Sequence, residues 1–172
     1  MLLKRVRCCQ RGFTLTELAI VSAIVGIFAA ISFPNLITWR RTQELKTAVS
    51  TMSNAMYEVR TKAIVERKNY TLTLDYPNNS YTLTKAGGPT RAGTALGAVV
   101  IDPDDSDETC PPLSDQNVVF RPNSTTDGVG YEAVYLKSKH PSITTRYRIR
   151  VLGPTGKITV EKWTGGTWKS AF

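Results

Sequence analysis

The first long apolar segment of the chain runs from Phe13 to Phe33 and contains a single ionisable residue, Glu17. At a rise of ~1.5 Å per residue, a helix over this segment spans roughly 30 Å, which matches the hydrocarbon core of a bilayer. The pattern therefore predicts a transmembrane helix over residues 13–34. Pro34 ends the segment, and because proline removes an internal hydrogen bond we expect it to bend the helix.

The next segment, residues 35–67, has the pattern of an amphipathic helix. Its apolar residues follow alternating steps of four and three, which places them on one helical face: Leu45, Val49, Met52, Met56, Val59 and Ala63. Charged and polar residues occupy the other faces. Such a stripe is more typical of a face packed on a sheet than of a partner surface. We expect one long helix from about Phe13 to about Glu66.

After Arg67 the apolar positions recur with a period of two, which is typical of β-strands. Residues 70–76 and 80–85 alternate on either side of Pro77-Asn78-Asn79 and predict a hairpin. Further short segments have strand character, at residues 98–101, 117–121, 132–137, 144–152 and 157–163. The predicted fold class is α+β, with a long N-terminal helix packed against an antiparallel β-sheet body over residues 68–172.

Charge separates residues 1–12 from the rest as a leader. This segment holds four cations and no acid, and its removal lowers the net charge from +8 to +4: Lys4, Arg5, Arg7 and Arg11. Cations on one side of a membrane helix hold that side in the cytoplasm, so the body is expected outside it. Two alternatives are a secretory signal cleaved near Ala30-Ile31-Ser32 and a plain membrane anchor. Neither explains Glu17.

Glu17 is the residue that points to a function. A carboxylate in hydrocarbon is costly unless it is paired, so an intramembrane acid predicts a functional role. If the chain is cut after Gly12, Phe13 carries a new terminal amine, and Glu17 lies one helical turn away. The helix N-terminus also favours a negative charge. The amine of a neighbouring chain is a further candidate when helices pack side by side with an axial offset.

These residues resemble the class III signal of type IV pilins and type II secretion pseudopilins. Gly12, Phe13, Glu17, the apolar helix and Pro34 are all in register with that signal. The resemblance implies that a prepilin peptidase cleaves after Gly12 and methylates the Phe13 amine. It implies that Glu17 then pairs with the amine of an adjacent subunit during assembly.

The same resemblance implies a location and a set of partners. The chain is expected in the bacterial inner membrane as a single-pass protein, with its N-terminus cytoplasmic and its body periplasmic, and afterwards in a pilus or pseudopilus. The expected partners are the membrane, other pilins or pseudopilins, the prepilin peptidase and the inner-membrane assembly platform.

The body resembles the GspH/FimT group of minor pilins and pseudopilins. The similarity lies in the order of three segments, "AMYEVRTKAIVERKNYTLTLD", "NVVFRPNSTTDG" and "RYRIRVLGPTGKITVEKW". It implies two sheets closed over the helix and a minor rather than a major subunit.

Several members of that group bind DNA, which gives an alternative function at a pilus tip in natural transformation. Five cations lie close together here: Lys137, Lys139, Arg146, Arg148 and Arg150. The three arginines alternate with apolar residues, so they share one strand face, expected to point outward. Cations ~7 Å apart along a strand suit successive phosphates. A solvated strand face is the plainer interpretation, and the segment Gly156-Lys157-Ile158-Thr159 departs from the Gly-Arg-x-Arg pattern of DNA-binding members.

Other chemistry has little support in the sequence. His140 precedes Pro141 in an expected loop, and no catalytic or phosphate-binding motif is present, so we expect neither an enzyme nor a cofactor. The acidic residues between Asp102 and Glu108 lack the spacing of a calcium loop and are expected to be solvated. Cys110 alone remains after the leader, which excludes an intrachain disulfide; it is expected to be structural.

Overall fold

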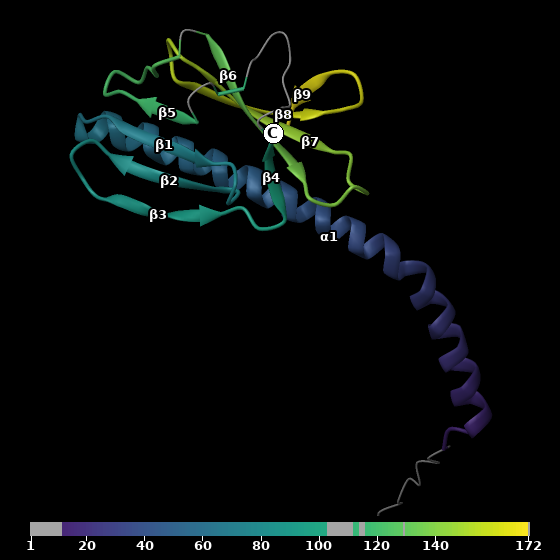
Figure 1. The fold of residues 1–172 in the computed structure, drawn as a ribbon. Coiled ribbons are helices and arrows are strands. Elements are labelled where there is room, and N and C mark those ends of the chain that lie inside the picture. Colours follow the sequence, from purple (N-terminus) through teal and green to yellow (C-terminus); the bar gives the residue numbers. More distant parts are fainter. Residues whose placement is uncertain (1–11, 103–111, 114–115, 129, 172) are drawn as a thin grey trace, which may run out of the picture. The chain divides into compact units, whose positions relative to one another are not determined.

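The computed structural model describes residues 12–102, 112–113, 116–128 and 130–171 (Figure 1). The chain divides into two compact units, Met1–Ile37 and Thr38–Phe172. One helix and nine strands make up the described part of the chain, and all the strands belong to the second unit. The predicted α+β class is confirmed.

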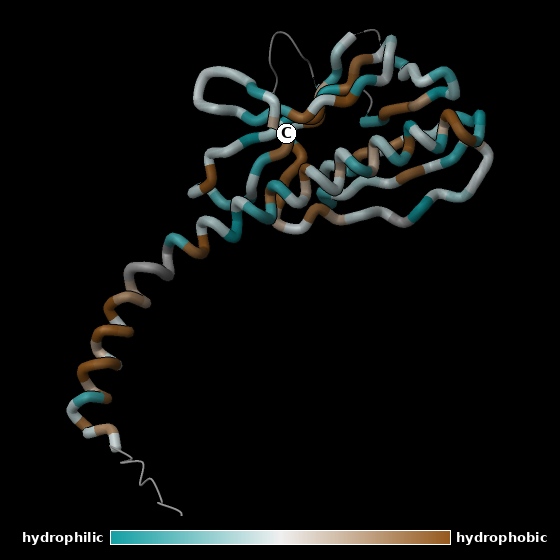
Figure 2. The backbone as a smooth tube through the Cα atoms, turned by 180° about the vertical axis from the view of Figure 1, so that it is seen from behind, coloured by the Kyte–Doolittle hydropathy of each residue, from teal (hydrophilic) through white to brown (hydrophobic). Residues whose placement is uncertain are grey.

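The helix α1 covers Leu15–Glu66, which agrees with the predicted limits to within two residues. The helix is continuous through Pro34. The bend expected at this residue stays a prediction. Within the first unit, the large apolar side chains of α1 whose burial is described are exposed, and hydrophobic residues dominate this part of the tube in Figure 2. Among the described residues, no single helix meets a length and hydropathy criterion for crossing a membrane. The segments Leu15–Ala30 and Asn35–Glu66 meet it only as a bent pair.

The apolar stripe of the second half of α1 forms the base of the hydrophobic core. All six predicted residues are at most 1% exposed: Leu45, Val49, Met52, Met56, Val59 and Ala63. They belong to one contiguous cluster with inward-facing residues of both sheets, among them Leu72, Phe120, Leu136 and Ile149. Burying each large side chain of this kind stabilises the fold by about 1.5–3 kcal/mol. The prediction that this face packs on a sheet is confirmed.

Two antiparallel sheets cover the helix in the second unit (Figure 1). The four-stranded sheet has the order β3-β2-β1-β5, with β1 at Tyr70–Asp75, β2 at Ser80–Lys85, β3 at Thr90–Ala95 and β5 at Asn117–Phe120. The five-stranded sheet has the order β4-β6-β7-β8-β9. Its strands are β4 at Val99–Asp102, β6 at Tyr131–Ser138, β7 at Arg146–Leu152, β8 at Lys157–Trp163 and β9 at Trp168–Ser170.

The predicted hairpin is confirmed as β1 and β2, with Asp75 opposite Ser80. Asp75 closes its turn by accepting hydrogen bonds from the backbone N–H of Asn78 at 3.1 Å and from the Asn78 side chain at 2.8 Å. Asn79 adopts a positive φ of 47°, a conformation that asparagine tolerates better than most residues. The turn chemistry therefore fixes the register of the hairpin.

Polar side chains of α1 tie the helix to the turns of the five-stranded sheet. Arg60 donates from Nε to Ser124 Oγ at 2.8 Å and from Nη2 to the Thr155 carbonyl at 3.2 Å. The Tyr57 hydroxyl donates to the Ile158 carbonyl at 3.0 Å. These bonds connect residues 64 to 101 positions apart and hold the C-terminal half of the chain on the helix.

We expect Gly153→Ala to destabilise the fold. A Cβ at this buried position would collide with the carbonyl group of Gly128, and backbone cannot rotate away as a side chain does. Overpacking of this kind typically costs about 1–3 kcal/mol in the free energy of unfolding. Denaturant titration of the full chain in detergent, followed by tryptophan fluorescence, measures the change.

Gly130→Ala is the matched control, because a Cβ there meets no atom within 4 Å. Equal midpoints for the two variants would contradict the close approach of residues 128 and 153.

Candidate assembly site

The N-terminus of α1 is closed by a reciprocal pair of side chains, Thr14 and Glu17. Glu17 Oε2 accepts hydrogen bonds from the Thr14 backbone N–H at 3.0 Å and from Thr14 Oγ1 at 2.9 Å. The Glu17 backbone N–H in turn donates to Thr14 Oγ1 at 3.3 Å. This is a capping box, in which the first and fourth residues satisfy each other's backbone donors. The spacing Thr14-x-x-Glu17 is the sequence signature of a capping box. An interpretation of Glu17 by its charge does not include this role.

The capping box gives Glu17 hydrogen bonds but no counter-charge. Both donors come from the neutral residue Thr14, so the carboxylate keeps its full negative charge. Glu17 and Phe13 are exposed, Phe13 to 79%, and a Cβ on Gly12 meets no atom within 4 Å. The leader residues 1–11 lie outside the described part of the chain. The start of the helix is therefore an accessible anionic site next to the predicted position of the new amine.

The three arginines of β7 share one face of the five-stranded sheet, as their alternation predicts, but they do not form a solvated row. Arg148 is only 4% exposed and Arg150 is half-buried, whereas Arg146 is exposed. The expectation of three outward cations in water is wrong for Arg148. Alternation along a strand fixes the face on which a side chain lies, and does not determine whether that face is covered.

Glu161 of β8 forms ion pairs with two of these arginines. Arg148 Nε donates to Glu161 Oε2 at 2.7 Å, and Arg150 Nη2 lies 2.6 Å from Glu161 Oε1. Arg148 and Glu161 are direct cross-strand partners in the sheet register. The sequence interpretation missed Glu161 because the pairing of β7 with β8 is needed to place it opposite Arg148.

Aromatic rings complete this outer face. The guanidinium carbon of Arg148 lies 4.4 Å from the ring centroid of Trp168, and that of Arg150 lies 4.7 Å from Tyr131. Trp168 also contacts Trp163 and Tyr135, with ring centroids 5.2 Å and 5.9 Å apart. Arginines that are stacked on aromatic rings and ion-paired in this way stabilise the fold, and their guanidinium groups are not available to bind a phosphate.

The remaining predicted residues are scattered. Lys137 forms an ion pair with Asp102, while Lys139 is exposed beyond the end of β6. The rest of the acidic segment and Cys110 lie outside the described residues. Within the part of the chain that the structure describes, no group of three or more His, Cys, Asp or Glu residues is arranged to hold a metal ion.

Two glutamates near the end of α1 have lowered pKa values. Hydrogen bonding to Lys62, at 2.6 Å from Glu58 Oε1, is the main cause for Glu58, and hydrogen bonding to Lys85 is the main cause for Glu66. Glu58 also pairs with Arg91 of β3 at 3.2 Å. These carboxylates link the helix to the edge of the four-stranded sheet, which is a structural role.

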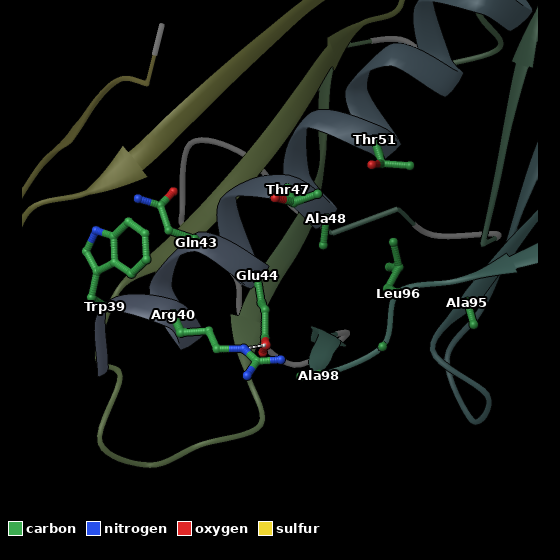
Figure 3. A pocket seen from close by; sticks show the side chains of 11 residues that line it. Trp39, Arg40, Gln43, Glu44, Thr47, Ala48, Thr51, Ala95, Leu96 and Ala98 are labelled. Carbon is green, nitrogen blue, oxygen red and sulfur yellow. Dashed lines mark ion pairs between the residues drawn. The ribbon is translucent and has the colours of Figure 1, made fainter. Parts of the chain in front are cut away.

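A groove of about 690 Å³ runs beside α1 in the second unit (Figure 3). The exposed side of the helix forms one wall and the connection between β3 and β4 forms the other. Trp39 lies at the end of the groove opposite the loop residues Leu96 and Ala98, and Arg40 pairs with Glu44 at 3.4 Å. The lining residues are Trp39, Arg40, Gln43, Glu44, Thr47, Ala48, Thr51, Ala95, Leu96, Gly97 and Ala98. Sequence patterns missed this groove because its two walls come from distant segments.

Comparison with known proteins finds sequence similarity in the N-terminal segment and structural similarity in the fold. Residues 7–33 match the family described as "Prokaryotic N-terminal methylation motif". The type IV major pilin protein PilA of Myxococcus xanthus is 39% identical over 61 residues, which cover 36% of this chain and 27% of that protein. The shared region is thus about a quarter of that relative's length.

The fold has solved counterparts. The type IV minor pilin FimU of Pseudomonas aeruginosa aligns with a TM-score of 0.52 at 11% identity, over 78% of this chain and 99% of FimU. The minor pseudopilin EpsH from the type 2 secretion system of Vibrio cholerae aligns with a TM-score of 0.48 at 12% identity, over 72% of this chain and 99% of EpsH. The N-terminal segment thus carries the prokaryotic methylation motif and is similar in sequence to a type IV pilin, and the body has the fold of the minor pilin FimU.

Proposed function

We propose that the chain is a minor subunit of a type IV pilus or of a type II secretion pseudopilus. Pilins and pseudopilins are structural subunits rather than enzymes, and the N-terminal motif indicates a membrane-anchored precursor. The observation that carries the proposal is the match of residues 7–33 to the methylation motif, with Gly12, Phe13 and Glu17 in register. The FimU-like fold of the body supports a minor subunit.

The proposed sequence of events begins in the inner membrane. Residues 13–34 span the membrane, and the leader keeps the N-terminus in the cytoplasm through its four cations. A prepilin peptidase cleaves after Gly12 and methylates the amine of Phe13. Cleavage removes these cations and exposes a positively charged terminus four residues before Glu17.

Electrostatics favours an amine as the partner of Glu17. The capping box satisfies hydrogen bonding around the carboxylate but leaves its charge, and an uncompensated charge in an apolar helix bundle is costly. The Phe13 amine of an adjacent subunit supplies the opposite charge, so that the carboxylate and the amine compensate each other. Each subunit therefore offers one cation to a neighbour and accepts one.

Helix packing supplies the remaining driving force. The apolar side chains along the first part of α1 are exposed in the single chain, among them Leu18, Ile20 and Phe28. In lipid such helices associate through close packing and interhelical contacts, and in a filament they cover one another. The assembly platform is proposed to move the subunit from the lipid bilayer into the filament.

The DNA-binding alternative receives no support from the site. Arg148 is buried beneath Trp168, and both Arg148 and Arg150 are ion-paired with Glu161, so neither guanidinium is a free phosphate ligand. These arginines stabilise the outer face of the sheet. The function that the geometry supports best is assembly.

We expect Glu17→Gln to abolish incorporation into filaments as fully as Glu17→Ala does. Glutamine at this position of a capping box still accepts from the backbone N–H of Thr14, so this variant removes the charge and keeps the cap. Loss of at least about tenfold, equivalent to about 1.4 kcal/mol, is expected in the sheared filament fraction of the native host, measured by immunoblot.

Thr14→Val is the matched control. It removes the hydroxyl of the cap but preserves the Glu17 charge, and incorporation is expected to fall much less. If Glu17→Gln assembled normally while Thr14→Val failed, the cap and not the charge would be the functional feature.

We expect the assembled protein to begin at methylated Phe13. Replacing Gly12 with leucine should leave the leader attached, because a bulky side chain would enter the expected cleavage position. Intact-mass spectrometry of the filament-bound and membrane-bound pools distinguishes the two forms. Gly26→Ala, in the middle of the apolar helix where a Cβ meets no atom within 4 Å, serves as the control and should be processed normally. Filament-bound protein that retains Met1 would contradict the proposed processing.

A further inference from the structure

Trp39 and Arg40 are conspicuously exposed at the point where α1 approaches the body. The Trp39 side chain is 58% exposed and the Arg40 side chain is 80% exposed. Among the residues of α1 whose burial is described, Leu45 is the first that is buried, and the hydrophobic core begins there. The fold of the body therefore gives no reason for a tryptophan at position 39.

The length of α1 places these residues at a boundary. If the apolar segment from Phe13 to Phe33 fills the ~30 Å hydrocarbon core, the headgroup layer of a bilayer ~40–45 Å thick covers the next four or five residues, about 34–38. Side chains on a helix lean toward its N-terminus, so the ring of Trp39 reaches back over the preceding turn. That turn lies within the headgroup layer.

The chemistry of the pair fits the same layer. Tryptophan is enriched at membrane–water interfaces because its ring is largely apolar and carries one polar N–H, and arginine binds phosphate through several donors. Among the described residues, Arg40 forms an ion pair with Glu44, at 3.4 Å across an exposed pair, and exposed ion pairs of this kind are weak. A lipid phosphate can therefore replace Glu44 as the partner of Arg40.

We propose that Trp39 and Arg40 form a membrane-surface anchor that binds the phospholipid headgroups of the periplasmic leaflet. The anchor sets the depth at which α1 rests before the subunit enters a filament. It holds the start of the body just outside the headgroup layer, since the first buried contact of the helix follows at Leu45. This inference rests on the proposed function, because it requires the first half of α1 to span the membrane.

Depth measurements on the full chain test the anchor. The protein, with Cys8, Cys9 and Cys110 replaced by serine, is reconstituted at low protein-to-lipid ratio in vesicles of phosphatidylethanolamine and phosphatidylglycerol. A nitroxide is attached to a cysteine at Val21, Leu36 or Val65, three exposed positions of α1. Electron paramagnetic resonance with oxygen and a water-soluble relaxant gives the depth of each label. We expect the labels in the hydrocarbon, at the phosphate level and in water, respectively.

The double substitution Trp39→Ala and Arg40→Ala should move the Leu36 label by about one helical turn, ~5 Å, or spread it over several depths. The matched control removes one apolar side chain near the far end of the helix and one cationic side chain just beyond it, Ile64→Ala with Lys68→Ala, and should not move the label. With Arg40→Ala alone, the shift should be larger in vesicles that contain phosphatidylglycerol than in vesicles without it.

The outcomes separate the two proposals. A Val21 label outside the hydrocarbon contradicts membrane anchoring itself. A Val21 label inside it, with a Leu36 label that lies in water or ignores the double substitution, overturns the headgroup anchor alone. Shielding of the Leu36 label only at high protein-to-lipid ratio would indicate a subunit contact at Trp39 and would equally overturn the anchor.

Discussion

The body of this protein depends on one stripe of apolar side chains along the second half of α1. Residues at alternating steps of three and four, from Leu45 to Ala63, are almost completely buried under both sheets. Inward-facing residues of both sheets join this stripe in one contiguous cluster, so the helix serves as the common core of the two. The same helix continues N-terminally as an apolar segment exposed in the single chain, which we propose enters the membrane and then the filament.

Much of the fold was predictable because its signals are local and periodic. The stripe on the helix, the limits of α1 and the β1–β2 hairpin all follow from apolar spacing and turn residues. Strand β3 was missed because Thr90–Ala95 is made of small and polar residues without an apolar alternation. Strand β9 was missed because it has three residues and exists only as the partner of β8, where Trp163 meets Trp168.

The candidate site was predictable in part. Residues that are close together in the sequence could be recognised as a site, whereas those brought together from distant segments could not. The residues of the N-terminal motif are consecutive, so Gly12, Phe13 and Glu17 are recognisable without a structure. The basic strand required knowledge of what covers it. A cation at position 148 looks solvated until Glu161 and Trp168 are placed over it by strands that follow later in the chain. The groove beside α1 likewise combines residues about fifty positions apart.

The capping box at the start of α1 has an entropic consequence for recognition between subunits. Because Thr14 holds the Glu17 carboxylate in one rotamer in the isolated chain, little side-chain freedom remains to be lost when a neighbour arrives. Recognition then resembles rigid docking of a charge into a preorganised receptor. In the proposed assembly, the same two hydrogen bonds that begin the helix would narrow the range of axial offsets at which Glu17 meets the amine of an adjacent helix.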